Sequence, residues 1–227
     1  MKTIEKKCIL LGLLTIVSLT TFAQSRDFLR NKIAEKGECR NVAITKYNGD
    51  LMLYGRNGWA ASGCPSSLTD ALDRLNDQNE YIDDIQLTEA GRWIILIGNN
   101  GFQWNDIPYS LERKLREFNE ANEVVLSVTF NDNNDWVVIT KNYISASDTG
   151  IQEWLAEGNE KFGMLWSVCV TNNSIVAVYE KGYKYYGDVP QSLKDALDNT
   201  TINVFRLKIA GSAWFFADTN GRYRYNM

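Results

Sequence analysis

The chain has 227 residues, with 28 acidic and 24 basic side chains, a net charge of −4 and no histidine. A net-acidic chain without a basic cluster argues against nucleic acid as a partner and against attraction to anionic membrane surfaces. The absence of histidine excludes Ser-His-Asp and Cys-His catalysis and the usual zinc and copper sites, so we expect no metal and no cofactor.

The N-terminal segment has the layout of a secretory signal peptide. Lysines near the start precede a short apolar run over residues 9–22, and Ala23 supplies a small residue for cleavage before Gln24. The run is too short for a stable membrane anchor. We therefore expect residues 1–23 to be removed and the protein to be exported, periplasmic or extracellular; a retained amphipathic helix is the alternative.

From Gln24 onward the sequence repeats itself five times with a period of roughly 40 residues, which is typical of repeat arrays and propellers. The clearest copy is the segment 93–111, with echoes at 51–68, 136–143, 175–193 and 214–221. We expect one domain over residues 24–227. Its repeats span about 26–64, 65–107, 108–147, 148–189 and 190–227.

Each repeat predicts three strands and a helix. In the second copy, residues 85–88 alternate apolar and polar, residues 93–97 are all apolar, and Asn100-Gly101 favours a hairpin before residues 102–104. An uninterrupted apolar strand is typical of a strand covered on both faces. Helices are expected near Pro65, Pro108, Asp148 and Pro190, where apolar residues follow at helical spacing.

The fifth repeat ends after its third strand, and its missing helix is found at the other end of the chain, where Phe28, Leu29 and Ile33 have helical spacing. The ends then complete each other, which favours a ring over an open array. Three antiparallel strands leave the third strand parallel to the first strand of the next repeat. The helix between these two strands is therefore predicted to be a parallel crossover. The expected fold is α+β, with five αβββ repeats closed into a pseudo-fivefold, propeller-like ring.

In repeat count, length and deduced strand order this arrangement resembles the pentein fold, the α/β propeller of guanidino-group-modifying enzymes and of a ribosome anti-association factor. The enzymes of that family use a cysteine with a histidine, and this chain has no histidine. The hydrophobic strand, glycine turn, aromatic residue and proline of each repeat also resemble the tachylectin type of five-bladed lectin, although the helices depart from that all-β pattern.

An aromatic residue follows the second turn in most repeats, and equivalent positions of a ring point in equivalent directions. Aromatic faces beside asparagines are typical of sugar or peptide sites; packing of the rings between repeats is the alternative. The third repeat varies most, so its edge from Tyr143 to Asp148 is a further candidate. The predicted binding residues are Trp59, Phe102, Tyr143, Tyr183, Asn57, Asn100 and Asp148.

Three cysteines follow residue 24. Cys39 and Cys64 flank the strands of the first repeat and are candidates for a disulfide in an oxidising compartment, whereas Cys169 is predicted to be a small buried hydrophobe. Among acidic residues, Asp83, Asp84 and Glu89 have the chemistry of glycoside hydrolysis, but a solvated surface is the favoured interpretation.

These features predict an exported binding or interaction module without catalytic activity, whose ligand is a carbohydrate or an envelope component. The alternatives are a carboxylate-dependent hydrolase of envelope glycans and a structural scaffold that docks other proteins.

Overall fold

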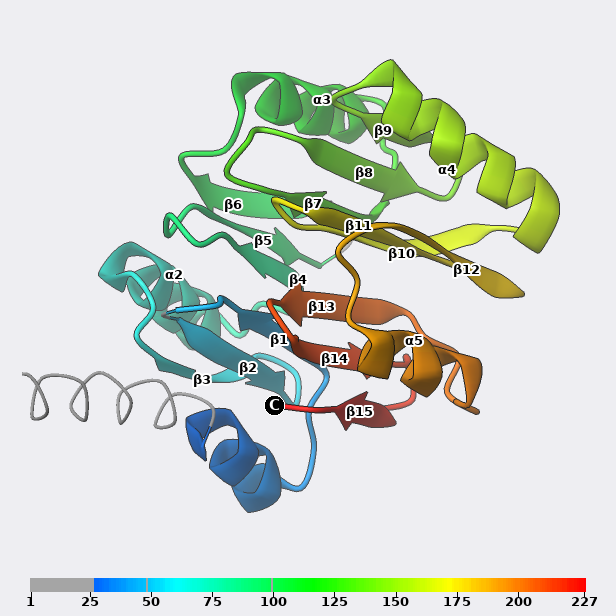
Figure 1. The fold of residues 1–227 in the computed structure, drawn as a ribbon. Coiled ribbons are helices and arrows are strands. Elements are labelled where there is room, and N and C mark those ends of the chain that lie inside the picture. The colour runs from blue at the N-terminus through cyan, green and yellow to red at the C-terminus, as the bar shows by residue number, and fades with distance from the viewer. Residues whose placement is uncertain (1–26, 48, 99) are drawn as a thin grey trace, which may run out of the picture.

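The computed structural model describes residues 27–47, 49–98 and 100–227, and the predicted signal peptide lies outside these ranges. Within them the chain forms five three-stranded antiparallel sheets, each built from strands that are consecutive in sequence (Figure 1). The predicted mixed α+β repeat is thus confirmed. We number the units 1 to 5 in chain order, one sheet in each.

The sheets are β1 (Asn41–Ile44), β2 (Asp50–Tyr54) and β3 (Gly58–Ser62); β4 (Ile82–Leu87), β5 (Trp93–Ile97) and β6 (Gly101–Asn105); β7 (Val125–Phe130), β8 (Trp136–Thr140) and β9 (Ile144–Ala146); β10 (Leu165–Val170), β11 (Ser174–Tyr179) and β12 (Gly182–Gly187); and β13 (Arg206–Ala210), β14 (Ala213–Ala217) and β15 (Tyr223–Tyr225). The helices are residues 27–36, α2 (Ser66–Asp77), α3 (Tyr109–Glu120), α4 (Thr149–Phe162) and α5 (Gln191–Asp198).

Each helix begins where the sequence predicts. Pro65, Pro108 and Pro190 precede α2, α3 and α5 with φ of −57°, −55° and −55°, a value that proline fixes and that leads into a helix. Helix α4 has no such proline before it. There Asp148 caps α4 instead, and its carboxylate accepts a hydrogen bond from the Ile151 backbone N–H.

The helices lie between neighbouring sheets. Leu68 and Leu72 of α2 pack in one apolar cluster with Leu51 of β2 and Ile95 of β5, so α2 fills the space between units 1 and 2. The clusters around α3, α4 and α5 join units 2 and 3, 3 and 4, and 4 and 5 in the same way. The predicted parallel crossover is wrong, because within the described residues each sheet contains only its own three consecutive strands and no third strand pairs with the first strand of the next unit.

The N-terminal helix fills the corresponding space between units 5 and 1, as the sequence predicts. Leu29 and Ile33 pack with Met52 of β2, Phe215 of β14 and the C-terminal Met227. The first strands follow the same order: β1 contacts β4, β4 contacts β7, β7 contacts β10, β10 contacts β13, and β13 contacts β1. Contacts thus run from each unit to the next and from the last unit back to the first.

The apolar second strands are covered on both faces. Trp93 and Ile95 of β5 belong to the cluster around α2, whereas Ile94 and Leu96 belong to the cluster around α3. Successive strand residues point to opposite faces, so one strand contributes to two cores. This confirms the interpretation of the uninterrupted apolar run.

The repeated tryptophan and serine of the sequence form a hydrogen bond. The Trp93 indole N–H donates to the Ser67 hydroxyl at 3.1 Å, and the pairs Trp136–Ser110 and Trp214–Ser192 repeat it at 2.9 and 3.1 Å. Each pair ties the second strand of a unit to the first turn of the helix that precedes its sheet. Units 1 and 4 have Asp50 and Ile175 at the tryptophan position.

Candidate functional site: a polar pocket at the ends of the first strands

Every second position of the first strands is buried, and eight of these ten positions hold polar or charged residues. Residues that pair with equivalent positions of the second strands form two layers. The lower layer lies toward the start of the first strands, and the upper layer lies two residues further along them. All ten residues are 9% exposed or less. The lower layer contains Asn41, Asp84, Ser127, Ser167 and Arg206, and the upper layer contains Ala43, Gln86, Thr129, Cys169 and Lys208.

An ion pair crosses the space between these strands. Lys208 Nζ of unit 5 lies 2.9 Å from Asp84 Oδ1 of unit 2 and 3.4 Å from Gln86 Oε1. The same Asp84 oxygen accepts a hydrogen bond from Asn41 Nδ2 of unit 1 at 2.6 Å. Burial alone would raise the pKa of Asp84, but the charges of Lys208 and Arg206 outweigh it and hold that pKa below its ordinary value.

A second ion pair lies at the start of the same strands. Arg206 donates to Asp83 Oδ1 at 3.0 Å and to the Leu126 carbonyl at 3.1 Å, so it joins units 5, 2 and 3. Burial raises the pKa of Asp83, and the neighbouring Arg206 opposes this shift only in part. Together the two pairs connect units that are not neighbours in chain order.

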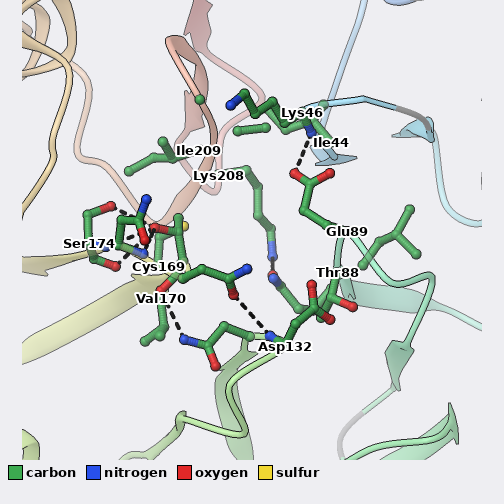
Figure 2. Close-up of a pocket in the computed structure, with 18 of the residues that line it drawn as sticks. Ile44, Lys46, Thr88, Glu89, Asp132, Cys169, Val170, Ser174, Lys208 and Ile209 are labelled. Atoms are coloured by element: carbon green, nitrogen blue, oxygen red, sulfur yellow. Dashed lines mark hydrogen bonds between the residues drawn. The ribbon is translucent and has the colours of Figure 1, made fainter.

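A pocket opens above the upper layer, where the first strands end and turn into the second strands (Figure 2). Its volume is about 460 Å³, which lies in the range of small-molecule sites. Residues from all five units line it. The polar and charged ones are Lys46, Tyr47, Gln86, Thr88, Glu89, Asn131, Asp132, Thr171, Asn172, Asn173, Ser174, Asp188 and Lys208.

The rim of the pocket is built by one kind of hydrogen bond that repeats from unit to unit. The backbone N–H of Lys46 donates to the Glu89 carboxylate, that of Ala90 to Asp132 Oδ2 at 3.2 Å, and that of Asp132 to Asn172 Oδ1 at 3.1 Å. Each acceptor is the second residue after a first strand, and it receives its bond from the unit before.

One carboxylate oxygen of the rim is left over. Asp132 Oδ1 is buried and has no hydrogen-bond partner among the residues that the structure describes. A buried acceptor without a partner is costly. Because this oxygen has almost no accessible surface, a ligand can donate a hydrogen bond to it only after the Asp132 side chain turns toward the pocket.

The charges around the pocket do not favour an anion. The charge of Lys208 is balanced by Asp84, which leaves Lys46 against the three carboxylates of Glu89, Asp132 and Asp188. The remaining lining groups are hydroxyls and amides, which both donate and accept. The pocket therefore suits a neutral ligand with many hydrogen-bonding groups.

The predicted aromatic residues lie elsewhere, on or beside the third strands. Trp59 packs against the α2 cluster, Phe102 lies 5.2 Å from Trp104, and Tyr183 lies 6.5 Å from Tyr185 between ring centroids. Tyr143 is 56% exposed and stacks on Phe118. The structure does not bring the four residues together, and all four are outside the lining of the polar pocket.

Two of these aromatic residues line separate lateral grooves. Phe102 and Trp104 face Arg74 of α2 in one groove. Tyr183 and Tyr185 line the other, which lies between β12 and the segment that follows α5.

The predicted polar partners have roles in the fold. Asn57 and Asn76 exchange side-chain-to-carbonyl hydrogen bonds of 3.2 and 3.1 Å, which tie the second turn of unit 1 to the end of α2. Asn100 and Asn119 repeat this exchange one unit later, at 3.4 and 2.7 Å. Asp148 is the cap of α4.

For the acidic residues, the interpretation of a solvated surface is wrong at Asp84, which is 1% exposed because Lys208 and Asn41 bind it inside the molecule. Glu89 lines the polar pocket. The Asn131–Asp135 run forms the turn between β7 and β8, where the Asn131 side chain accepts from the backbone N–H groups of Asn133 and Asp135.

The predicted disulfide is not formed in the part of the chain that the structure describes, where Cys39, Cys64 and Cys169 are free thiols. Cys39 lies in the cluster between units 5 and 1, and Cys64 lies against the cluster between units 1 and 2. Their sulfurs contact the carbonyls of Asn41 and Asp50, each at 3.6 Å. Burial raises the pKa of both thiols to about 12. Cys169 is buried, as predicted.

Sequence reasoning missed the two polar layers. The signal was the apolar–polar alternation of residues 85–88, together with Lys208 between two apolar residues of β13. Such alternation is typical of a strand with one face in water. Here the polar face is turned toward the other first strands, and the sequence does not distinguish these two cases.

Comparisons with known proteins add little. No family model matches the chain, and no curated protein matches it. Among solved structures, the C-terminal domain of gp131 from bacteriophage phiKZ is similar over 68% of this chain and 53% of that chain, with 14% identity and a TM-score of 0.39. The matched part thus spans about half of that chain. No helix within the described residues has the length and apolar character needed to cross a membrane.

Proposed function

We propose that this protein is an exported binding module without catalytic activity, whose five units form a closed pseudo-fivefold ring and whose polar pocket binds a short, neutral saccharide. The ring is supported by the contacts between β13 and β1 and by the N-terminal helix packed between units 5 and 1. Export is supported by the signal-peptide pattern of residues 1–23.

The observation that carries the proposal is the convergence of all five units on one pocket that retains an unpartnered buried acceptor, Asp132 Oδ1. A sugar hydroxyl is a natural partner because it donates to a carboxylate and accepts from the amides of Asn172 and Asn173. Tyr47, which is 53% exposed, adds an aromatic ring at the edge of the pocket.

The hydrolase alternative receives less support. Glycoside hydrolysis needs a carboxyl group with a raised pKa at the scissile bond, and among the described residues burial raises the pKa of Asp83. Asp83 is absent from the lining of the pocket and is bound to Arg206. The carboxylates at the rim, Glu89 and Asp132, already accept backbone N–H groups.

The test is a glycan array followed by titration calorimetry on residues 24–227. The variant Asp132→Asn keeps one side-chain oxygen for the Ala90 N–H but replaces the free acceptor by a donor. We expect it to weaken binding by about tenfold, or 1.4 kcal/mol. Asp148→Asn is the matched control, since asparagine also caps a helix, and it should bind as the wild type does.

Three other outcomes would contradict the proposal. A blank array would remove saccharides as the ligand class. Binding that survives Asp132→Asn but is lost in Tyr183→Ala would move the site to the lateral groove between β12 and α5. Release of free reducing ends during incubation would favour the hydrolase.

A further inference from the structure

We infer that the pocket takes one end of a saccharide chain and that the rest of the chain leaves across Gly211, at the rim between units 5 and 1. This inference rests on the proposed function and names the part of the ligand that is bound and its direction.

The first step is that the pocket is closed below. Lys208 and Gln86 lie beneath it in the upper layer, and Lys208 is bound to Asp84 in the lower layer. Gln86 also donates to the Phe130 carbonyl of unit 3 at 3.4 Å, and Thr129 accepts from the Val170 N–H of unit 4 at 3.0 Å. Buried side chains therefore block passage through the middle of the molecule, so a chain cannot thread the pocket and enters by its end.

The second step is that the rim is not uniform. Units 2, 3 and 4 place Glu89, Asp132 and Asn172 at the second position after the first strand, and each side chain bridges to the unit before. In unit 5 the first strand continues to Ala210, and the residue three positions after the upper-layer Lys208, as Glu89 is after Gln86, is Gly211, which has no side chain. In unit 1 it is Lys46, whose ammonium group cannot accept a hydrogen bond.

The third step is the space at Gly211. The three atoms nearest to a Cβ built on this residue are Cγ, Cδ and Cε of Lys46, at 3.5, 3.7 and 3.9 Å, and these are ordinary contact distances. At this place Gly211 has no side chain to bridge the units, and the rim is covered by the flexible side chain of Lys46, which can move aside. Lys46 is placed to donate a hydrogen bond to an oxygen of the second sugar residue as the chain leaves.

The backbone of Gly211 allows a precise test. Its φ is +61°, in the left-handed region where asparagine and aspartate are the best tolerated replacements for glycine. Gly211→Asn would give unit 5 the side chain that Asn172 gives unit 4 and would hold the rim closed beside Lys46. Gly221→Asn is the matched control, because Gly221 has φ of +80° and nothing within 4 Å of a built Cβ, and it lies in the turn between β14 and β15.

The probes are two matched pairs, glucose with maltotriose and N-acetylglucosamine with chitotriose, titrated by calorimetry into the wild type and both variants. For a pair in which the wild type binds both members, we expect Gly211→Asn to weaken trisaccharide binding by about tenfold and to leave monosaccharide binding within about twofold. Gly221→Asn should leave both unchanged. Gly211→Asp is the second variant should the first fail to fold.

The outcomes separate the two proposals. Unchanged trisaccharide binding by a folded Gly211→Asn protein would overturn the exit across Gly211 and leave the pocket as the binding site. Equal weakening of the monosaccharide and the trisaccharide would also overturn it, because the substitution would then act on the pocket itself. If the wild type binds none of the four probes, both the proposed binding of a saccharide in the pocket and the proposed exit of its chain across Gly211 are overturned.

Discussion

Lys208 and Asp84 are 124 residues apart in the chain, yet their charged groups lie 2.9 Å from each other in a site where both side chains are at most 8% exposed. The pair joins unit 5 to unit 2 beneath the polar pocket. A buried ion pair costs desolvation of both charges, so it is weak evidence of net stabilisation. Because the pair joins two first strands, substitutions of Lys208 or Asp84 test how these strands are arranged.

Removal of the lysine alone should be strongly destabilising. Lys208→Met leaves the Asp84 carboxylate buried without its cation, and we expect a loss of about 3–5 kcal/mol in the free energy of unfolding, measured by urea denaturation. The double variant Lys208→Met with Asp84→Asn should recover most of this loss, because the amide still accepts from Asn41. Lys141→Met, at an exposed lysine, is the control. Equal losses in the single and double variants would contradict the ion pair.

The stability of the protein should depend on Asp84 at acid pH. Because the pKa of Asp84 is lowered in the folded state, its contribution is present above the unfolded pKa of about 3.9 and is lost as the pH falls through the folded value. Asp84→Asn should therefore flatten the fall in unfolding free energy below about pH 4.

Asp83→Asn should have the opposite effect on that curve. The pKa of Asp83 is raised by burial, so the folded state takes up this proton first and gains stability on acidification. Its replacement should make the acid loss steeper, measured by urea denaturation from pH 6 to pH 3. The same slope in both variants would contradict the two assignments.

The tryptophan–serine hydrogen bond can be tested with adjacent serines of α2. Ser67→Ala removes the acceptor of the nearly buried Trp93 N–H and should cost about 1–2 kcal/mol in unfolding free energy. Ser66→Ala, one residue earlier in the same turn, should cost only a few tenths of a kcal/mol, because both serines are exposed but Ser67 is the one that accepts the Trp93 N–H. A similar cost at both positions would mean that the bond does not contribute.

The assignment of Asp148 as a helix cap predicts a difference between two substitutions. Asp148→Ala should lower the unfolding free energy by about 1 kcal/mol, whereas Asp148→Asn should change it by only a few tenths, because asparagine also accepts the Ile151 N–H. Urea denaturation measures both. If alanine is as stable as asparagine here, the cap is not formed.

The state of the cysteines can be read by mass spectrometry. Protein covering residues 24–227, unfolded without reductant and treated with iodoacetamide, should carry three alkyl groups, because Cys39, Cys64 and Cys169 are free. In the folded protein the reaction should be slow, since burial raises the pKa of Cys169 to about 11 and of the other two to about 12. One alkyl group after unfolding would restore the predicted disulfide.

Local signals in the sequence correctly predict most of the repeat. Pro108 marks the start of α3, the leucine spacing marks its buried face, and the apolar run of residues 93–97 marks a strand with two covered faces. Even the N-terminal helix is placed correctly, since the repeat lacks a helix at one end and has one to spare at the other. These predictions succeed because propensity, capping and periodicity act within a few residues of each other.

The candidate site depends on contacts that no local pattern contains. Lys208, Asp84 and Asn41 come from three different units, and their polar character alone fits a solvated strand face equally well. The aromatic residues after the second turn are predicted to form a binding site because they recur in most repeats. In the structure Trp59 and Phe102 pack against the cores beside their third strands. Repetition at a position reflects a packing requirement common to all units, whereas Asp132 and Gly211 differ between units and surround the pocket.

The sequence by itself determined the five αβββ units, their helix starts and their buried faces, because each of these follows from interactions between residues close in the chain. Only the tertiary structure decided that the helices separate the sheets and that the polar sides of the first strands face one another. Both features depend on contacts between residues as far as 124 positions apart in the chain. The free energy of burying charges in pairs depends on partners that only this packing provides.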